Sequence, residues 1–481
     1  MSSDLKHKTV MALFWNFVEK FGQQLIYLLT GLVVSRIVTP AEYGLVGVLT
    51  IFIAFSTILA ESGFSSSLIR KQDAREIDYS TIFLFNMGVS LFLYLLLFFT
   101  APAIAAFYET PQITPVARIL FLAVIFNSSA IVQQVQMTKK LEFKLLGKIN
   151  LIALFFSSLI SVVLATSGYG VWALVAQTVG LAFLRTLLLW VFGAWHISFG
   201  FDFGVIRSFF GYSSRLILVS AMNAVANNFY SLLIGKIYNR SDVGYYNQAN
   251  KYQEMPAGII NNTFRSVLFP VLSRVNEDAE RTKRVLRRII SMMSLIIFPV
   301  MFLLIVIAKP LIVALISDVW LPSVPIFQVL CIAGAFMPFT MMFGDSFSAM
   351  GRSGLTLRYE FVRKLLLFGG IALLFKSGII ALAWLWVGYM VVSVMLSLYY
   401  MRFTLHYSYR EFLGDAYRPF LTAAVLAVGL HQTTPFFNNM YLQMGVQIVI
   451  MGVLYLSVLF LLKDETLLDG IGMAKSRFKK E

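Results

Sequence analysis

Charge and cysteine are both scarce in this sequence. Asp, Glu, Lys and Arg make up 13% of the 481 residues, whereas 58% are hydrophobic and the mean hydropathy is +0.78. Such a composition is typical of a polytopic membrane protein and excludes an ordinary soluble domain. Cys331 is the one cysteine, which excludes a disulfide framework and a cysteine-based metal site. The four histidines show no ligand spacing, so we predict neither a metal nor a cofactor.

Apolar runs of about 20 residues, the length that crosses a bilayer, predict an all-α protein with about 14 transmembrane helices. Glu19 and Lys20 interrupt the first run and no cleavage site follows it, so we interpret this run as a membrane helix and not as a signal peptide. The predicted spans are 10–36, 44–67, 80–106, 116–137, 149–167, 170–193, 211–236, 243–272, 288–308, 323–350, 359–377, 379–401, 419–433 and 441–462.

The Lys and Arg residues alternate between dense and sparse connections. With the N-terminus inside, the predicted cytoplasmic segments hold most of the 39 Lys and Arg residues, including the basic clusters at 139–148 and 274–288. Under the positive-inside rule this pattern places both termini in the cytoplasm. The net charge of +15 is therefore mainly a topological signal, with some attraction to anionic lipid headgroups, and we do not expect nucleic-acid binding.

The span 243–272 carries polar residues at helical spacing. Because they follow one another by three or four positions, these side chains share one helix face. A charged side chain at the centre of a membrane helix costs roughly 2.5–3.5 kcal/mol, which argues against a lipid-facing position and favours a polar cavity. In the alternative interpretation, Lys251 and Glu254 pair with each other. The residues on this face are Asn247, Lys251, Glu254, Gly258, Asn261 and Arg265.

An internal repeat appears when the chain is shifted by 200 residues. Glu42-Tyr43-Gly44 superposes without a gap on Asp242-Val243-Gly244, and a basic residue precedes both. Six predicted helices separate the two copies, and an even number gives both the same orientation. We therefore predict an N-terminal lobe of six helices at 1–193, a C-terminal lobe of six helices at 194–401, and two further helices with a cytoplasmic tail at 402–481.

Two stretches carry a resemblance to a known family. SRIVTPAEYGLVGVLTIF at 35–52 and VGYYNQANKYQEMPAGIINNTFRSVLFPVLSR at 243–274 resemble the polysaccharide transporter family of the MOP superfamily, the Wzx-type flippases related to MATE exporters. Within the family, the chain is most similar to exporters of the colanic-acid type. The resemblance implies a V-shaped, MATE-like bundle that flips undecaprenyl-diphosphate-linked oligosaccharide across the bacterial inner membrane for surface polysaccharide biosynthesis. The alternatives are a MATE-type multidrug or cation antiporter and a lipid II flippase.

The polar residues of the spans suit such a cargo. Arg and Lys bind phosphate through charge-assisted hydrogen bonds, and Asn, Gln and Tyr offer partners to sugar hydroxyls. Interhelical hydrogen bonds, a Glu19–Lys20 salt bridge and snorkelling of Arg185 or Arg215 are the structural alternatives. The candidate cavity-lining residues are Glu19, Lys20, Gln23, Tyr27, Arg185, Arg215, Asn223, Asn227, Asn247, Lys251, Glu254, Asn261, Arg265 and Asp345.

The charges are distributed unequally between the two halves. Ile51, Ala54 and Ser65 of the second span occupy the positions that match Lys251, Glu254 and Arg265 of the eighth, so the substrate phosphate is expected nearer the second lobe. Arg265 has no acidic residue one turn away; its expected partner is either the diphosphate or Asp345, which is also a candidate partner for Arg185. A buried carboxylate is also a candidate site for a coupling proton or sodium ion. The short outside connections argue against an enzyme. Polysaccharide assembly proteins are possible partners.

Overall fold

The structure is a computed structural model, and it describes residues 3–61, 64–71, 73–140, 142–210, 217, 220–222, 233–275, 278–350, 353–469 and 472. Its regular elements are helices, with no strand among these residues. Nine helices of the described part are long and apolar enough to cross a membrane. The protein is therefore a multi-pass, all-α membrane protein, as the sequence predicts. By contact density the chain divides into two units, Met1–Gly244 and Tyr245–Glu481.

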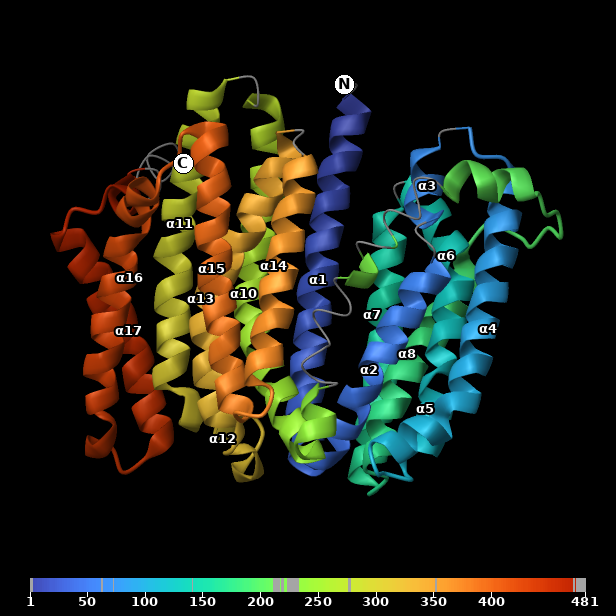
Figure 1. The fold of residues 1–481 in the computed structure, drawn as a ribbon, viewed down its shortest axis with the longest axis horizontal. Helices are drawn as coiled ribbons and strands as arrows, with labels where there is room; N and C mark the ends of the chain where they lie inside the picture. The colour runs from blue at the N-terminus through green and yellow to red at the C-terminus, as the bar shows by residue number, and fades with distance from the viewer. Residues whose placement is uncertain are drawn as a thin grey trace. The chain divides into compact units, whose positions relative to one another are not determined.

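The first unit is a bundle of long helices that lie side by side, with α7 packed against both α1 and α8 (Figure 1). Its predicted spans lie on described helices, apart from 211–236, which lies largely outside the described residues, and 44–67, which covers parts of the helices Pro40–Glu61 and Phe64–Arg70. The helix is interrupted at Phe121, so the predicted span 116–137 consists of two helices. The elements are α1 (Ser3–Ile37), α2 (Pro40–Glu61), α3 (Phe64–Arg70), α4 (Glu76–Phe107), α5 (Ile113–Leu120), α6 (Leu122–Lys139), α7 (Phe143–Thr166) and α8 (Val171–Phe192).

The second unit is built around α11 and α13, which pack against each other and against α16 and α15, respectively. Helix α10 begins at the end of the first unit and continues into the second. The elements are α10 (Arg240–Val275), α11 (Ala279–Val306), α12 (Ala308–Leu315), η1 (Asp318–Trp320), α13 (Ser323–Ala349), α14 (Ser353–Leu374), α15 (Ile379–Leu405), α16 (Tyr409–Gln432), η2 (Thr434–Phe436) and α17 (Met440–Leu461).

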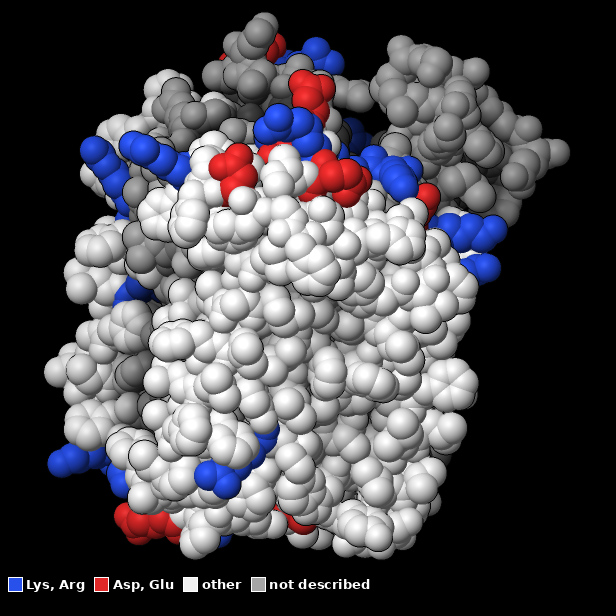
Figure 2. Space-filling view, turned by 90° about the vertical axis from the view of Figure 1, so that its right-hand side faces the viewer, with Lys and Arg blue, Asp and Glu red and all other residues white. Residues whose placement is uncertain are grey.

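The outward faces of these helices are apolar. Phe92 and Phe99 of α4, for example, are 65% and 73% exposed. Figure 2 shows a broad uncharged belt, with charged side chains gathered near its upper and lower edges. A surface of this kind is suited to lipid, because hydrocarbon tails solvate apolar side chains that water would not.

The internal repeat is visible in the hydrogen bonds that lead into α2 and α10. The backbone N–H of Val38 donates to Val34, and 200 positions later Tyr238 donates to Ile234. The acidic residue in the first turn then accepts from the backbone N–H that precedes the helix. This bond is 2.9 Å from Thr39 to Glu42 and 3.1 Å from Asn239 to Asp242. The two copies therefore fold alike, and their sequence similarity reflects a shared helix-start geometry.

The starts of α2 and α10 also touch each other reciprocally. A Cβ added to Gly44 would overlap the carbonyl oxygen of Arg240, and a Cβ added to Gly244 would overlap that of Pro40. Pro40 and Arg240 are themselves 200 residues apart, so the contact has an approximate local two-fold symmetry. Both glycines are needed because only a residue without a side chain permits this approach of two backbones. The division at 1–193, 194–401 and 402–481 rests on the helix count and stays a prediction.

Candidate functional site

The clearest charged pair among the candidates joins α10 to α13 in the second unit. Arg265 Nε lies 2.7 Å from Asp345 Oδ2, and a terminal guanidinium nitrogen donates to Oδ1 over 3.0 Å. The structure thus gives Arg265 the partner that its sequence neighbourhood lacks. The Arg265 side chain is still 58% exposed, whereas that of Asp345 is 18% exposed. This bidentate geometry orients the guanidinium while leaving part of it accessible.

The other residues on the polar face of α10 differ in their burial. Asn261 is buried, and its amide nitrogen lies 3.1 Å from the sulfur of Met341. Asn247 is half-buried, and a Cβ at Gly258 would meet open space. Lys251 is half-buried and Glu254 exposed, and no ion pair joins them, so the predicted alternative in which they neutralise each other is not found. The face is therefore part buried and part open.

A second polar cluster surrounds Glu19 in the first unit. One Glu19 oxygen accepts from Gln23 over 3.1 Å and from Asn150 of α7 over 2.8 Å. Lys20 is exposed and has no ion-pair partner in the described part of the chain, so the predicted Glu19–Lys20 bridge is not found either. Glu19 is instead anchored by amides, which joins α1 to α7.

Arg185 of α8 reaches into the same part of this unit. A guanidinium nitrogen donates to Gln134 of α6 over 2.5 Å. Glu19, Glu61 and Tyr27 lie close enough to interact with it electrostatically. Arg185 is thus hydrogen-bonded within the bundle. Three predicted residues, Arg215, Asn223 and Asn227, lie outside the described residues.

The structure adds a buried cationic cluster on α14 that sequence reasoning did not single out. Arg363 and Lys364 are only 8% and 9% exposed. Arg363 donates to Glu360 over 2.8 Å and to the Ser393 hydroxyl of α15 over 3.0 Å. Its guanidinium also lies over the Tyr389 ring, 5.2 Å from the centroid. Glu61, Gln134 and Asn150 were likewise not predicted.

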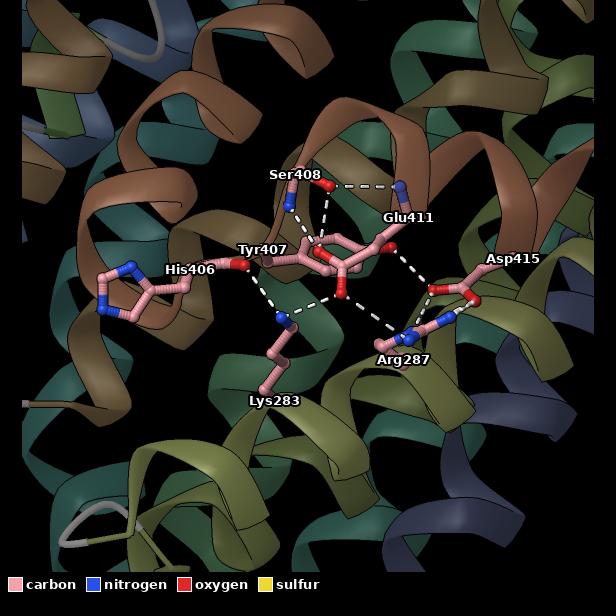
Figure 3. A network of polar contacts seen from close by, with 7 residues as sticks. All are labelled: Lys283, Arg287, His406, Tyr407, Ser408, Glu411 and Asp415. Carbon is pink, nitrogen blue, oxygen red and sulfur yellow. Dashed lines mark hydrogen bonds and ion pairs between the residues drawn. The ribbon is translucent and has the colours of Figure 1, made fainter.

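Figure 3 shows another network, which ties the start of α11 to the connection between α15 and α16. Lys283 bonds Glu411 over 2.8 Å and the carbonyl of His406 over 2.8 Å. Arg287 donates to both oxygens of Asp415, over 3.0 and 2.7 Å. The side chains of this cluster are paired with one another, so it joins the helices and leaves little capacity for a ligand.

Glu411 lies at the centre of that network, ahead of the apolar part of α16. Partial burial favours its protonated form, but hydrogen bonds from Lys283 and from the backbone and side chain of Ser408 outweigh this and lower its pKa to about 2. Burial raises the pKa of the neighbouring Tyr407, whose hydroxyl donates to Asp415 over 2.9 Å. Glu411 therefore stays ionised across the physiological range.

Two curated relatives resemble the chain over most of its length. The teichuronic acid biosynthesis protein TuaB of Bacillus subtilis (strain 168) is 26% identical over 398 residues, which are 80% of this chain and 81% of that protein. The succinoglycan biosynthesis transport protein ExoT of Rhizobium meliloti (strain 1021) is 23% identical over 471 residues, 96% of this chain and 95% of that protein.

Two solved structures share the fold. The lipid II flippase MurJ in an inward closed conformation is 14% identical, with a TM-score of 0.73 over 94% of this chain and 99% of that chain. A multidrug resistance MATE transporter of the MOP superfamily in an inward-facing conformation is 16% identical, with a TM-score of 0.60 over 86% and 96%. These likenesses confirm the MATE-like fold class.

The family model described as "Polysaccharide biosynthesis protein" matches residues 33–325, which is more than half of the chain. That range includes both copies of the internal repeat and the whole polar face of α10. The repeat and α10 are therefore within the region by which the family is recognised, and this chain belongs to the polysaccharide biosynthesis protein family.

Proposed function

We propose that this protein is a flippase that moves an undecaprenyl-diphosphate-linked oligosaccharide from the cytoplasmic to the outer leaflet of the inner membrane by alternating access. Membership of the family and similarity to the transport protein ExoT support a role in polysaccharide export. The cargo has an anionic diphosphate, hydroxyl-rich sugars and a polyprenyl tail. Such a headgroup needs a cationic, hydrogen-bonding lining within the membrane while the tail stays in lipid.

The observation that carries this proposal is the exposed Arg265 guanidinium. Asp345 occupies two of its five N–H donors, and more than half of the side chain remains accessible. A guanidinium held in place by one carboxylate can bind a phosphate with the remaining donors without first being ordered. Lys251, which has no ion pair within the described residues, supplies a second cation on the same helix.

The cations of the two units differ in their accessibility to a ligand. In the first unit Arg185 donates to Gln134 and interacts electrostatically with Glu19 and Glu61. In the second unit the Arg265 side chain stays 58% exposed although Asp345 pairs with it, and Lys251 has no ion-pair partner among the described residues. We therefore propose that the substrate phosphate rests nearer the second unit.

The competing functions require different linings. A cation or drug exporter is expected to favour acidic and aromatic side chains, whereas a cationic excess fits an anionic cargo. A lipid II flippase would differ mainly in the sugar it carries. We further propose that the protein acts as a transporter rather than an enzyme, with both termini in the cytoplasm, polysaccharide assembly proteins as neighbours, and a proton or sodium ion as the coupling ion.

Export by charge-neutralised variants tests this proposal. In a deletion strain, Arg265→Ala and Lys251→Ala should each reduce surface polysaccharide about tenfold or more, because each removes a charge-assisted bond to phosphate worth about 1.5–3 kcal/mol. Lys20→Ala, which removes an exposed cation of the first unit, should have a smaller effect. The measurement is surface polysaccharide together with the lipid-linked sugar that accumulates inside.

The Arg265 variant also breaks an ion pair, so a second variant separates folding from transport. Exchanging the pair, with Arg265→Asp and Asp345→Arg in one chain, keeps an ion pair between α10 and α13 but moves the cation to α13. We expect normal membrane levels and impaired export. Full export by this exchange, or greater loss for Lys20→Ala than for Arg265→Ala, would contradict the proposal.

A further inference from the structure

A separate cavity of about 580 Å³ opens in the first unit, away from the polar clusters described above. It lies among the connection into α4, the C-terminal end of α6 and the chain that follows α8. Its volume falls within the range of small-molecule sites. The lining residues are Ala74, Glu76, Tyr79, Gln136, Lys139, Lys140, Ala194, Trp195 and His196.

The floor of the cavity is rigid. Trp195 is 3% exposed and packs against Phe83, with ring centroids 5.3 Å apart. Its indole N–H donates to Glu76 over 3.0 Å, and its carbonyl accepts from Gln133 over 2.7 Å. The aromatic floor therefore belongs to a hydrogen-bonded core, and the cavity is formed in advance of any ligand.

Two lysines supply the positive charge of the cavity. Lys139 donates to the carbonyl of Lys71 over 2.6 Å and lies over the Tyr79 ring, which fixes its ammonium. Lys140 is exposed and has no ion-pair partner within the described chain. Glu76 and Gln136 provide acceptors beside them. This set fits a group that is anionic at one end and carries hydroxyl donors at the other.

The chain leaving the cavity is apolar and outward-facing. Directly after His196, Ile197, Phe199, Phe201 and Phe203 occur at every second position and are 43%, 86%, 43% and 76% exposed. The Asp202 backbone N–H donates to Thr81 over 3.0 Å, which anchors this segment to α4. A row of exposed aromatic side chains beside lysines is typical of the boundary between headgroups and acyl chains.

Helix α6 separates this cavity from the Arg185 cluster. Gln134 bonds Arg185, whereas Gln136, two residues later and therefore about 200° around the helix, lines the cavity. The cavity thus faces the opposite side of α6 from the membrane-buried charges. A molecule held there would belong to the surrounding bilayer rather than to the transport route.

We propose that this cavity binds the headgroup of a resident anionic phospholipid, with the phosphate between Lys139 and Lys140. The glycerol hydroxyls of phosphatidylglycerol would donate to Glu76 and Gln136, and its acyl chains would lie along Phe199 and Phe203. The site does not depend on the proposed transport activity.

Native mass spectrometry of the full-length protein with phosphatidylglycerol tests the site. We expect one tightly held lipid per chain, bound about tenfold more weakly by Lys140→Ala because one charge-assisted contact is lost. Lys148→Ala is the matched control, since Lys148 is also an exposed lysine of the first unit without a described ion pair. This variant should bind phosphatidylglycerol as tightly as the unmodified protein does. Lys139→Gln keeps a hydrogen-bond donor for the carbonyl of Lys71 but removes the charge, and it should also weaken phosphatidylglycerol binding.

Three results would overturn the proposal. Equal binding of phosphatidylglycerol and phosphatidylcholine would exclude an anionic headgroup site. Retention of undecaprenyl diphosphate in place of phosphatidylglycerol would make the cavity a docking site for cargo. Thermal stabilisation by inorganic phosphate equal to that by phosphatidylglycerol would identify a free-anion site. Unchanged unfolding temperatures of the lysine variants without lipid would show that weaker binding does not come from misfolding.

Discussion

Individual carboxylate side chains have different roles in this protein, and that of Glu411 is structural. It holds Lys283 through its side chain and closes a capping box with Ser408 at the start of α16. Lys283 belongs to α11 and Ser408 precedes α16, so one residue joins the two helices. Asp345 resembles it in pairing with a cation, but the Arg265 side chain is 58% exposed, whereas that of Lys283 is 15% exposed. Pairing alone therefore does not separate a structural carboxylate from one in the proposed binding site.

Glu411 leads to a prediction on acid stability. Its folded-state pKa of about 2 lies below the ordinary value of 4.5, so the ionised form stabilises the fold above pH 4.5. This contribution should be lost as the pH falls from 4.5 towards 2. Glu411→Gln should lower the free energy of unfolding by about 1–3 kcal/mol at pH 7 and flatten that acid dependence.

Thermal unfolding of the detergent-solubilised protein across this pH range provides the measurement. Glu465→Gln is a suitable control, because Glu465 is exposed near the end of the described chain and has no described ion pair. An unchanged acid profile in Glu411→Gln would show that other carboxylates govern acid unfolding.

At the scale of elements, the repeated helix starts are the feature most open to test. Gly44→Ala should overpack the crossing of α2 and α10, because the new Cβ meets backbone and not a flexible side chain. Overpacking of this kind costs about 1–3 kcal/mol. Gly244→Ala should have the same effect, since its contact with Pro40 is the symmetric counterpart.

Gly88→Ala is the matched control for these glycine variants. Gly88 lies within α4, and a Cβ there would meet no atom within 4 Å. It should leave the unfolding temperature unchanged or raise it, because alanine favours a helix over glycine. Equal behaviour of Gly44→Ala and Gly88→Ala in a thermal unfolding assay would contradict a tight crossing.

The helices themselves could be predicted because each long apolar run has one physical explanation. The sequence left the partner of Arg265 open between the diphosphate and Asp345, because Arg265 and Asp345 are 80 positions apart and no pattern joins them. Arg363 and Lys364 were not among the predicted site residues, although both lie within the predicted span 359–377. The helix begins at Ser353, which places both residues in its interior. Gln134 and Asn150 are neutral, so no charge within an apolar span marked them as site residues.

At the scale of the whole molecule, the distribution of Lys and Arg predicts which ends of the helices face the cytoplasm. Arg281 lies in the first turn of α11 and Lys309 in α12, just beyond the other end of α11, and both are exposed. Because Cys331 is the single cysteine and is buried, Cys331→Ala yields a cysteine-free background. In that background, Lys309→Cys should react with a membrane-impermeant maleimide in intact cells, whereas Arg281→Cys should react only after permeabilisation.

Reagent added to permeabilised cells should label both cysteines equally, which controls for accessibility within the protein. Labelling of Arg281→Cys in intact cells would reverse the predicted topology and with it the direction of transport. Labelling of neither position in permeabilised cells would show that the sites are shielded and would contradict their exposed placement.

The length of α10 orders the two cations of its polar face, Lys251 and Arg265, by depth. Its 36 residues rise roughly 54 Å, while the hydrocarbon layer is about 30 Å thick. For a helix near the membrane normal that enters at Arg240 from outside, Lys251 lies near mid-membrane, and Arg265, about 21 Å further along, lies level with the cytoplasmic lipid phosphates. A diphosphate arriving in that leaflet would thus meet Arg265 without leaving its own layer, and Lys251 would be the next cation on its way across.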